Sequence, residues 1–393
     1  MDHLKQVEIL RQLMRYVSEG DTSRRTNVAC NDARQYWSQD GLHLEKERLF
    51  RQWPLVLGLS GDIPVPGSFL TDEVADVPIL LVRGQDGIAR AFLNACRHRG
   101  TRLVSEPRGE RLRFSCPFHA WTYDPAGSLS GVPKAGSFGE LDKAKLGLIA
   151  LPTVERYGIV WAMSRPGLAV DIEECLGGLG AELADWNLDK QVVFHTQTLH
   201  RHMNWKLAND TFGETYHFEF LHRGTLAAVY HSNATAYETF GRNHRMVFAA
   251  RTIDGLRQLP QSEWQLRPHS TIAYFLYPNT QLLVSRQNVA LYRIFPHRDD
   301  PGRCRIEQSL FLDREATTAE DREICSQAVR THEGVIIGED FVVAESAQTA
   351  LSSGLLPHVM YGRNEPALHH YHESFRRALE SPSPQPGPGR ARS

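Results

Sequence analysis

The chain has 393 residues, of which 41% are hydrophobic and 23% charged, with 44 basic and 46 acidic side chains. This composition excludes a largely disordered chain, and a net charge of −2 gives no support for nucleic-acid binding. No apolar run approaches the ~18 residues that a membrane-spanning helix needs, and the first residues lack the regions of a signal peptide. We therefore expect a soluble cytoplasmic protein of two or three folded units, at roughly 150 residues per domain.

The N-terminal part is predicted to be helical. Its apolar side chains recur at helical spacing over residues 4–17. A second helix is expected from Leu42 to Trp53, because Pro54 would end it. We assign residues 1–53 to an N-terminal helical segment that packs on the larger domain.

Residues 54–163 are predicted to form a small all-β domain. Their apolar runs are short, as at Val77–Val82, and turn sequences such as Asp124–Gly127 separate them. Ser164–Gly167 is a plausible boundary after this domain.

Residues 164–380 are predicted to form a larger α+β domain. Strands are expected at Thr271–Tyr277 and Gln281–Ser285, and a long helical stretch at Thr318–Leu351. Residues 381–393 are too rich in Pro and Gly to pack, so we expect a disordered tail.

The β domain carries two short Cys/His motifs. Cys96-x-His98 and Cys116-x-x-His119 could converge on one metal centre, since thiolates and imidazoles are common ligands. In a [2Fe–2S] cluster, the two Cys would hold one iron and the two His the other. A structural zinc site and a chance arrangement are the alternatives. The remaining cysteines have no partner motif and are expected to be reduced thiols; they are Cys30, Cys175, Cys304 and Cys325.

The two motifs, with Gly100 after the first and Trp121 after the second, resemble the cluster-binding pair of Rieske iron–sulfur domains. They suit in particular the Rieske domains of non-haem iron oxygenases. The resemblance implies that Cys96, His98, Cys116 and His119 bind the cluster.

A second candidate metal site begins with His217 and His222. In an ideal helix, positions five apart are rotated by ~140°, so the pair can share a metal only if the helix ends or is distorted there. The segment is not the His-Glu-x-x-His motif of metalloproteases. Taken alone, two such histidines are more often ordinary core or surface residues.

Together with a Rieske domain, this segment is similar to the mononuclear iron motif of the catalytic α subunits of Rieske non-haem iron oxygenases, the aromatic-ring-hydroxylating family. The resemblance extends from about Tyr36 to about Leu355. It implies Asp340 as the third iron ligand, which would complete a 2-His-1-carboxylate triad with open positions. Glu339 and Glu345 are competitors that spacing alone does not exclude. The implied fold is a Rieske domain followed by an α+β catalytic domain of the helix-grip type.

The resemblance also implies how electrons arrive. The chain has no Gly-x-Gly-x-x-Gly fingerprint for NAD or FAD, so a separate reductase, possibly with a ferredoxin, would pass electrons from NAD(P)H to the cluster. In the family, the cluster of one subunit serves the iron of the next, which implies a homotrimer. Glu214 would bridge His217 to His119 of the neighbouring subunit. Most family members have Asp at this position, and Glu resembles the branch that acts on quaternary ammonium compounds.

We expect a terminal oxygenase that uses O2 to hydroxylate or dihydroxylate a small organic substrate, with an aromatic one favoured. The alternatives are a monooxygenase of a carnitine-like or betaine-like quaternary ammonium substrate, and a Rieske electron-transfer protein without catalytic iron. A zinc-stabilised binding module is a further alternative. The substrate pocket is expected among residues 212–226 and 271–289, with aromatic side chains that could hold a ring or a quaternary nitrogen: Tyr216, Phe218, Phe220, Tyr274 and Phe275.

Overall fold

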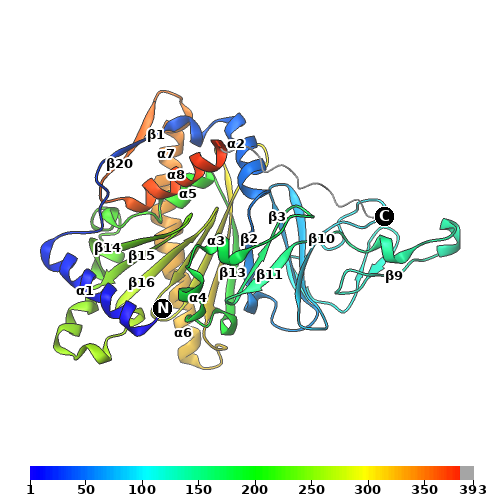
Figure 1. The fold of residues 1–393 in the computed structure, drawn as a ribbon, viewed down its shortest axis with the longest axis horizontal. Coiled ribbons are helices and arrows are strands. Elements are labelled where there is room, and N and C mark those ends of the chain that lie inside the picture. Colours follow the sequence, from blue (N-terminus) through cyan, green and yellow to red (C-terminus); the bar gives the residue numbers. More distant parts are fainter. Residues whose placement is uncertain (381–393) are drawn as a thin grey trace.

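The computed structural model describes residues 1–380, and the predicted disordered tail at 381–393 lies outside the described residues. Two β-rich parts lie side by side along the long axis of the molecule, and the helices gather on the part with the large sheet (Figure 1). The predicted α+β class is confirmed.

The larger part is built on a seven-stranded antiparallel sheet with the order β13-β19-β18-β17-β16-β15-β14. Neighbouring side chains alternate between its faces: Tyr274 and Leu291 belong to one buried cluster, and Phe275 and Tyr292 to another. Both faces are therefore covered, which explains the continuous apolar runs of β16 and β18. The strands are β13 (Val192–Arg201), β14 (Tyr230–Phe240), β15 (Asn243–Ala250), β16 (Ser270–Leu276), β17 (Thr280–Val284), β18 (Val289–Pro296) and β19 (Cys304–Leu312).

Helices cover the two faces of this sheet. The first, third and fourth helices contribute to one apolar cluster, while the fifth, seventh and eighth contribute to the other. No helix within residues 1–380 is long and apolar enough to cross a bilayer. The helices are α1 (His3–Glu19), α2 (Gln39–Glu45), α3 (Ile172–Leu176), α4 (Gly180–Ala184), α5 (Trp205–Asp210), α6 (Ala319–His332), α7 (Phe341–Ser352) and α8 (Pro366–Glu380).

The predicted helices exist, with altered ends. The helix expected at 4–17 is α1, whose first turn is capped by Asp2. The helix expected from Leu42 begins earlier, at Gln39, because the Ser38 hydroxyl accepts a hydrogen bond from a first-turn amide, and it continues as a π-helix over Lys46–Phe50. The stretch expected at 318–351 is helical, but a π-helix at Glu333–Asp340 separates α6 from α7.

The smaller part contains three antiparallel sheets, ordered β10-β5-β4-β3-β6, β11-β12-β2 and β7-β8-β9. A further pair, β1 (Ala29–Asp32) with β20 (His358–Tyr361), ties the N-terminal segment to the C-terminal region. The strands of the smaller part are β2 (Leu55–Leu59), β3 (Ser68–Val74), β4 (Val77–Arg83), β5 (Ala89–Leu93), β6 (Arg108–Glu110), β7 (Phe114–Ser115), β8 (Thr122–Tyr123), β9 (Leu129–Gly131), β10 (Ala150–Leu151), β11 (Thr153–Arg156) and β12 (Ile159–Ala162).

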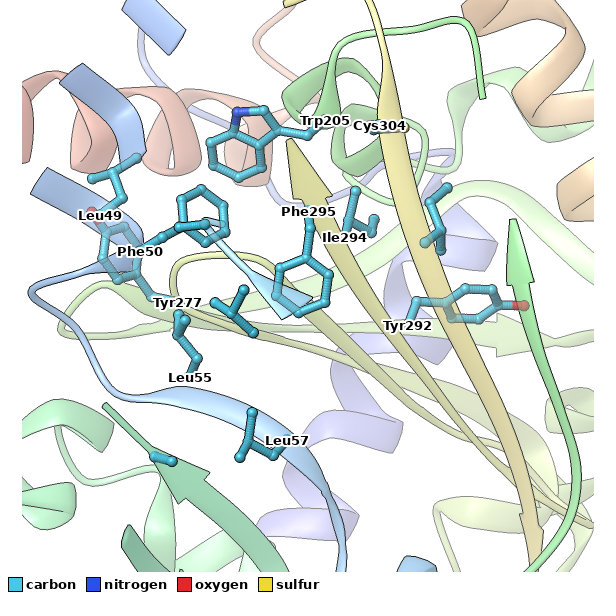
Figure 2. Close-up of a cluster of buried hydrophobic side chains, with 14 of the residues drawn as sticks. Leu49, Phe50, Leu55, Leu57, Trp205, Tyr277, Tyr292, Ile294, Phe295 and Cys304 are labelled. Carbon is cyan, nitrogen blue, oxygen red and sulfur yellow. The ribbon is translucent and has the colours of Figure 1, made fainter. Parts of the chain in front are cut away.

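One apolar core joins the two parts. Leu55 and Leu57 of β2 belong to the same buried cluster as Tyr277 and Phe295 from the large sheet (Figure 2). Phe50 packs edge-on against Trp205 with ring centroids 5.0 Å apart. The smaller part is therefore fixed against the sheet by hydrophobic burial as well as by chain connectivity.

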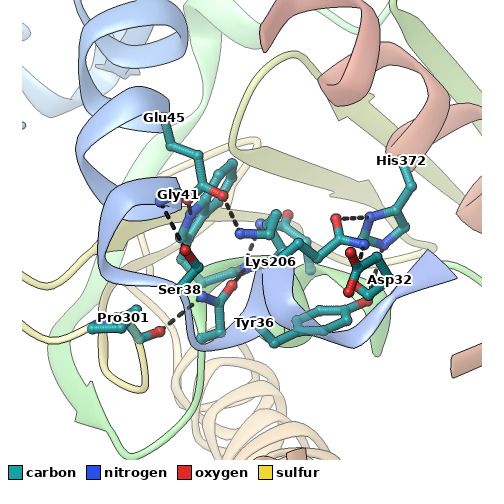
Figure 3. Close-up of polar contacts among 12 residues, drawn as sticks. Asp32, Tyr36, Ser38, Gly41, Glu45, Lys206, Pro301 and His372 are labelled. Carbon is teal, nitrogen blue, oxygen red and sulfur yellow. Dashed lines mark hydrogen bonds and ion pairs between the residues drawn. The ribbon is translucent and has the colours of Figure 1, made fainter. Parts of the chain in front are cut away.

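Buried polar contacts hold α5 in place. The Lys206 ammonium pairs with the Glu45 carboxylate, and both side chains are almost fully buried (Figure 3). The indole of Trp205 donates to the same carboxylate at 2.7 Å, so Glu45 satisfies two donors. This anchoring fixes the start of the segment that leads to His217.

Candidate metal centres and cavity

The two Cys/His loops of the smaller part have matching backbone geometry. In the first, the Cys96 amide donates to the Thr101 carbonyl and the Gly100 amide to the Cys96 carbonyl; in the second, Cys116 and Ala120 make the equivalent bonds, all at 2.8–2.9 Å. The residue four positions after each Cys, Gly100 or Ala120, has a positive φ. Each loop is therefore a closed turn that presents its Cys and His from a fixed backbone.

The four predicted cluster-binding side chains lie together. The rings of His98 and His119 have centroids 4.7 Å apart, and His98 stacks on Trp121 at 5.0 Å. Cys96 and Cys116 are buried free thiols, and His98 Nδ1 is a buried atom with no hydrogen-bond partner among the described residues. Two sulfur donors and two imidazoles, one with an unpartnered nitrogen, fit a Rieske [2Fe–2S] cluster.

The outer edge of this site is exposed. His119 lies at the surface, and Phe118 beside it is 54% exposed. The strands β9 and β10 near these loops lie at the opposite end of the molecule from β14–β16 and α1 (Figure 1). An exposed imidazole and an exposed apolar ring are suited to contact with another protein surface.

The second predicted site is assembled from two distant segments. Asp340 Oδ1 lies 3.3 Å from His217 Nε2 and 3.1 Å from His222 Nε2. One ligating atom from each of the three residues falls within 4.8 Å of the others. Of the competitors, Glu345 instead pairs with Arg201. Two imidazoles and one carboxylate at these distances form a donor set that fits Fe(II).

Local backbone geometry brings the two histidines together. A 3₁₀ turn, Tyr216–Glu219, carries His217 and ends at Phe220, so His222 lies beyond it. The sequence requirement that the helix end between the two histidines is therefore met. Asp340 is the last residue of the π-helix Glu333–Asp340. Such π turns occur mainly at functional sites, because they change the direction of side chains within a helix.

Two carboxylates hold the outer nitrogens of the imidazoles. Glu214 contacts His217 Nδ1, and it also accepts a hydrogen bond from the His217 amide at 3.1 Å. Glu339 contacts His222 Nδ1 and accepts a hydrogen bond from the Thr225 hydroxyl at 2.9 Å. Each Nδ1–H donation fixes the ring so that Nε2 faces Asp340, where it is placed to act as a metal ligand once its proton is displaced. Glu339, considered from sequence as a rival to Asp340, lies at the Nδ1 side of the His222 ring, away from the atoms that the triad brings together.

The electrostatics of this site favour a cation. Desolvation lowers the pKa of His217, but the hydrogen bonds to Asp340 and Glu214 outweigh it and raise the pKa to about 10. The carboxylates thus stabilise positive charge between the imidazoles and Asp340.

A cavity of about 350 Å³ adjoins His217 and Asp340. Its lining includes residues from both predicted segments and from the helices at 327–340, together with Val229, Tyr230 and Phe248, which lie outside the predicted segments. Of the five predicted aromatic side chains, only Phe218 lines it. Tyr216 and Phe220 are exposed by 51% and 52%, so that part of the prediction is wrong. The aromatic walls are instead Phe212, Phe218, Tyr230 and Phe248.

Strand geometry explains why Tyr274 and Phe275 are absent from the lining. Thr271 and Ala273 of β16 face the cavity, and Tyr274 points to the opposite face of the sheet. Phe275 lies farther along the strand and packs against Tyr371 with ring centroids 4.8 Å apart. Both belong to the apolar cores.

A buried hydrogen-bond network lies on the other side of the His217 segment, and sequence reasoning missed it. The carboxylate of Asp210 accepts from the Tyr36 hydroxyl at 2.6 Å and contacts His372 Nε2 at 2.7 Å. Asn31 and Tyr361 extend the network (Figure 3 shows its Tyr36–His372 region). Its members are separated by up to 341 residues, so no local spacing could reveal it.

His332 lines the cavity and provides a test of its burial. Desolvation and the nearby His195 lower its pKa from 6.5 to about 4. Between these pH values the unfolded chain takes up a proton that the folded protein does not, so the free energy of unfolding falls as the pH falls. As the pH falls from 6.5 to about 4, the free energy of unfolding should therefore decrease more in the wild type than in His332→Gln. We expect the difference between the two decreases to reach about 3 kcal/mol, measured by urea unfolding. Parallel pH profiles for the two proteins would contradict this.

Comparison with known proteins shows what the chain resembles. The Rieske [2Fe-2S] domain matches residues 53–154, and the ring hydroxylating alpha subunit (catalytic domain) matches residues 188–381. The 2-aminobenzenesulfonate 2,3-dioxygenase subunit alpha of Alcaligenes sp is 31% identical over 65% of this chain and 65% of that protein. The glycine betaine monooxygenase oxygenase subunit of Chromohalobacter salexigens is 32% identical over 46% of this chain and 40% of that protein.

These alignments span less than two-thirds of the length of either relative. Among solved structures, a quaternary ammonium Rieske monooxygenase studied for carnitine oxidation and inter-subunit electron transfer matches with a TM-score of 0.75. The match has 22% sequence identity and covers 90% of this chain and 95% of the other. At this identity the likeness shows a shared fold.

Proposed function

Because this chain belongs to the family of Rieske non-haem iron oxygenase α subunits, we propose that it is the terminal oxygenase of a multicomponent enzyme. It would use O2 and electrons from a separate reductase to hydroxylate or dihydroxylate a small aromatic substrate. The observation that carries this proposal is the triad of His217, His222 and Asp340 beside a largely apolar cavity, in a chain that also has a Rieske domain.

We assign the residues as follows. Cys96, His98, Cys116 and His119 hold the cluster, which the buried thiols and the unpartnered His98 Nδ1 support. His217, His222 and Asp340 hold the mononuclear iron. When bound, the iron activates dioxygen with electrons that the cluster supplies.

The chain's own residues prepare the site for this chemistry. Glu214 and Glu339 keep the two Nδ1 protons in place, so the two Nε2 atoms would be free to bind a cation that also binds Asp340. Phe218, Tyr230 and Phe248 form mutual edge-to-face contacts with centroids 5.4–6.2 Å apart. These rings would orient a flat substrate and exclude water from the face that reacts.

Electron transfer is proposed to cross a subunit interface in a homotrimer. Two features support this: His119 lies at the surface of the smaller part, and the triad lies in the larger part of the chain. Glu214, already bound to His217, would accept a hydrogen bond from the neighbour's His119. The structurally similar quaternary ammonium monooxygenase is described with inter-subunit electron transfer. A reductase, with or without a ferredoxin, would supply the electrons.

A second candidate function is monooxygenation of a quaternary ammonium substrate. It is favoured by the glutamate at position 214 and by the glycine betaine monooxygenase among the relatives. The rings of Phe218, Tyr230 and Phe248 could hold a trimethylammonium group by cation–π attraction.

Oxygen incorporation tests the proposed function. The holoenzyme, supplied with a surrogate reductase and NADH, is incubated under ¹⁸O2 with aromatic and quaternary ammonium candidates, and products are analysed by mass spectrometry. Labelled hydroxylated aromatic products support the main proposal, and loss of a labelled aldehyde from the ammonium compounds supports the second. Absence of substrate-dependent O2 uptake would leave only an electron-transfer role.

A further inference from the structure

The cavity has different chemistry along its length. Glu214, His217 and Asp340 line the part of the cavity at the candidate metal site, and aromatic rings line another part. The remaining polar lining includes the loop at residues 285–288, where Arg286 and Gln287 are exposed. This loop therefore lies where the cavity meets solvent.

The loop joins β17 to β18 and is held in a defined shape. The Ser285 amide donates to the Asn288 carbonyl at 3.0 Å, which closes a tight turn. The half-buried guanidinium of Arg267 donates to the Ser285 carbonyl at 2.6 Å. Arg286 is thus carried on a braced turn, and its side chain lines the cavity.

Strand length separates this loop from the metal-binding end. From Asn288, the chain runs along β18 to Tyr292, whose hydroxyl contacts the cavity-lining His332 of α6. Four residues of strand span about 13 Å. Because the long Arg286 side chain extends from this loop into the cavity lining, the gap that a small substrate must span is shorter than this.

Arg286 has no partner of its own. It is the one Arg or Lys side chain among the lining residues, and no carboxylate within residues 1–380 pairs with it. The nearest acidic lining residues, Glu214 and Asp340, belong to the metal-binding end. A guanidinium binds a carboxylate or sulfonate through two parallel hydrogen bonds, and it repels an ammonium group.

We propose that Arg286 determines substrate specificity, and that the substrate carries an anionic group, a carboxylate or sulfonate, at the end remote from the iron. This inference rests on the proposed function and specifies its substrate class. Both an aromatic acid and a zwitterionic trimethylammonium carboxylate have this chemistry. In the zwitterion, the ammonium group would lie among the aromatic rings, away from Arg286.

Equilibrium binding tests the proposal without turnover. Calorimetry on the holoenzyme compares two matched pairs: benzoate with benzamide, and γ-butyrobetaine with its primary amide. We expect the wild type to bind the acid more tightly than the amide in one pair. In Arg286→Gln, the affinity for that acid should fall by about tenfold to thirtyfold, while the affinity for its amide should change by less than twofold. Arg286→Lys keeps the positive charge but not the two parallel N–H donors of a guanidinium. Its affinity for the acid should therefore lie between those of the wild type and Arg286→Gln.

Arg165→Gln is the matched control, because it also removes one exposed positive charge but does not line the cavity. It should leave all four affinities unchanged. The pair whose acid loses affinity in Arg286→Gln shows whether the anionic group belongs to an aromatic acid or to a trimethylammonium carboxylate. The proposal is overturned if the wild type prefers neither acid over its amide, or if Arg286→Gln leaves the preference intact. Failure of the proposed function would appear separately, as an absence of O2 uptake in a protein that still binds the acid.

Discussion

Replacing Asp340 by alanine is expected to abolish substrate oxidation while leaving the visible and EPR signals of the Rieske cluster unchanged. Asp340 Oδ1 faces both imidazoles at 3.1–3.3 Å, and the cluster loops belong to a separate part of the chain. Loss of the one carboxylate of the triad should release the mononuclear iron, since two imidazoles alone bind it weakly. Turnover, iron content and EPR are measured on the same preparation.

Two neighbouring carboxylates serve as controls for this variant. Glu345→Gln should retain iron and turnover, because Glu345 bonds Arg201 and the His202 amide rather than an imidazole of the triad. Glu339→Gln should give an intermediate result, with iron affinity weakened by about 10-fold to 100-fold, since it only orients His222. If Asp340→Ala still turns over and Glu345→Gln does not, the ligand assignment is wrong.

Replacing Glu214 by glutamine is expected to reduce turnover by about 10-fold to 100-fold, with the iron and the reducible cluster both present. Glutamine has nearly the same size, but its amide lacks the charge that stabilises the Nδ1 proton of His217. In a single-turnover experiment, a pre-reduced cluster should be oxidised much more slowly by O2 and substrate than in the wild type.

A carboxylate on the 3₁₀ turn that follows Glu214 gives the control for Glu214. Glu219 is exposed, and within the described chain it has no contact with His217 or His222 through its side chain. Glu219→Gln should oxidise its cluster at the wild-type rate. Glu214→Asp should recover part of the activity, because the carboxylate returns on a shorter stem. If the cluster of Glu214→Gln is oxidised at the wild-type rate, Glu214 is not part of the path of electron transfer.

The members of both proposed metal-binding sets could be grouped from sequence where they lie close along the chain. Cys96 with His98, and Cys116 with His119, are carried on short turns, so their spacing reflects a local geometry that the structure contains. His217 and His222 required a broken helix, and the 3₁₀ turn supplies one. Asp340 came only from resemblance to a family, because nothing local links residue 340 to residue 222.

The remaining features depend on tertiary packing that spacing does not encode. A π-helix lets Glu339 and Asp340, adjacent in sequence, face the two nitrogens of one imidazole. The pocket aromatics were mispredicted at Tyr274, since an apolar strand covered on both faces does not reveal which face borders the cavity. The Asp210 network joins the N-terminal segment to α8, so it becomes visible only in three dimensions.

Metal and sulfide analysis of the purified holoenzyme tests the central claim most directly. A chain that holds a Rieske [2Fe–2S] cluster and a separate catalytic iron should contain one iron more than the two irons and two acid-labile sulfides of its cluster. Iron equal to sulfide would indicate an electron-transfer protein without catalytic iron. Zinc in place of iron and sulfide would contradict the account altogether.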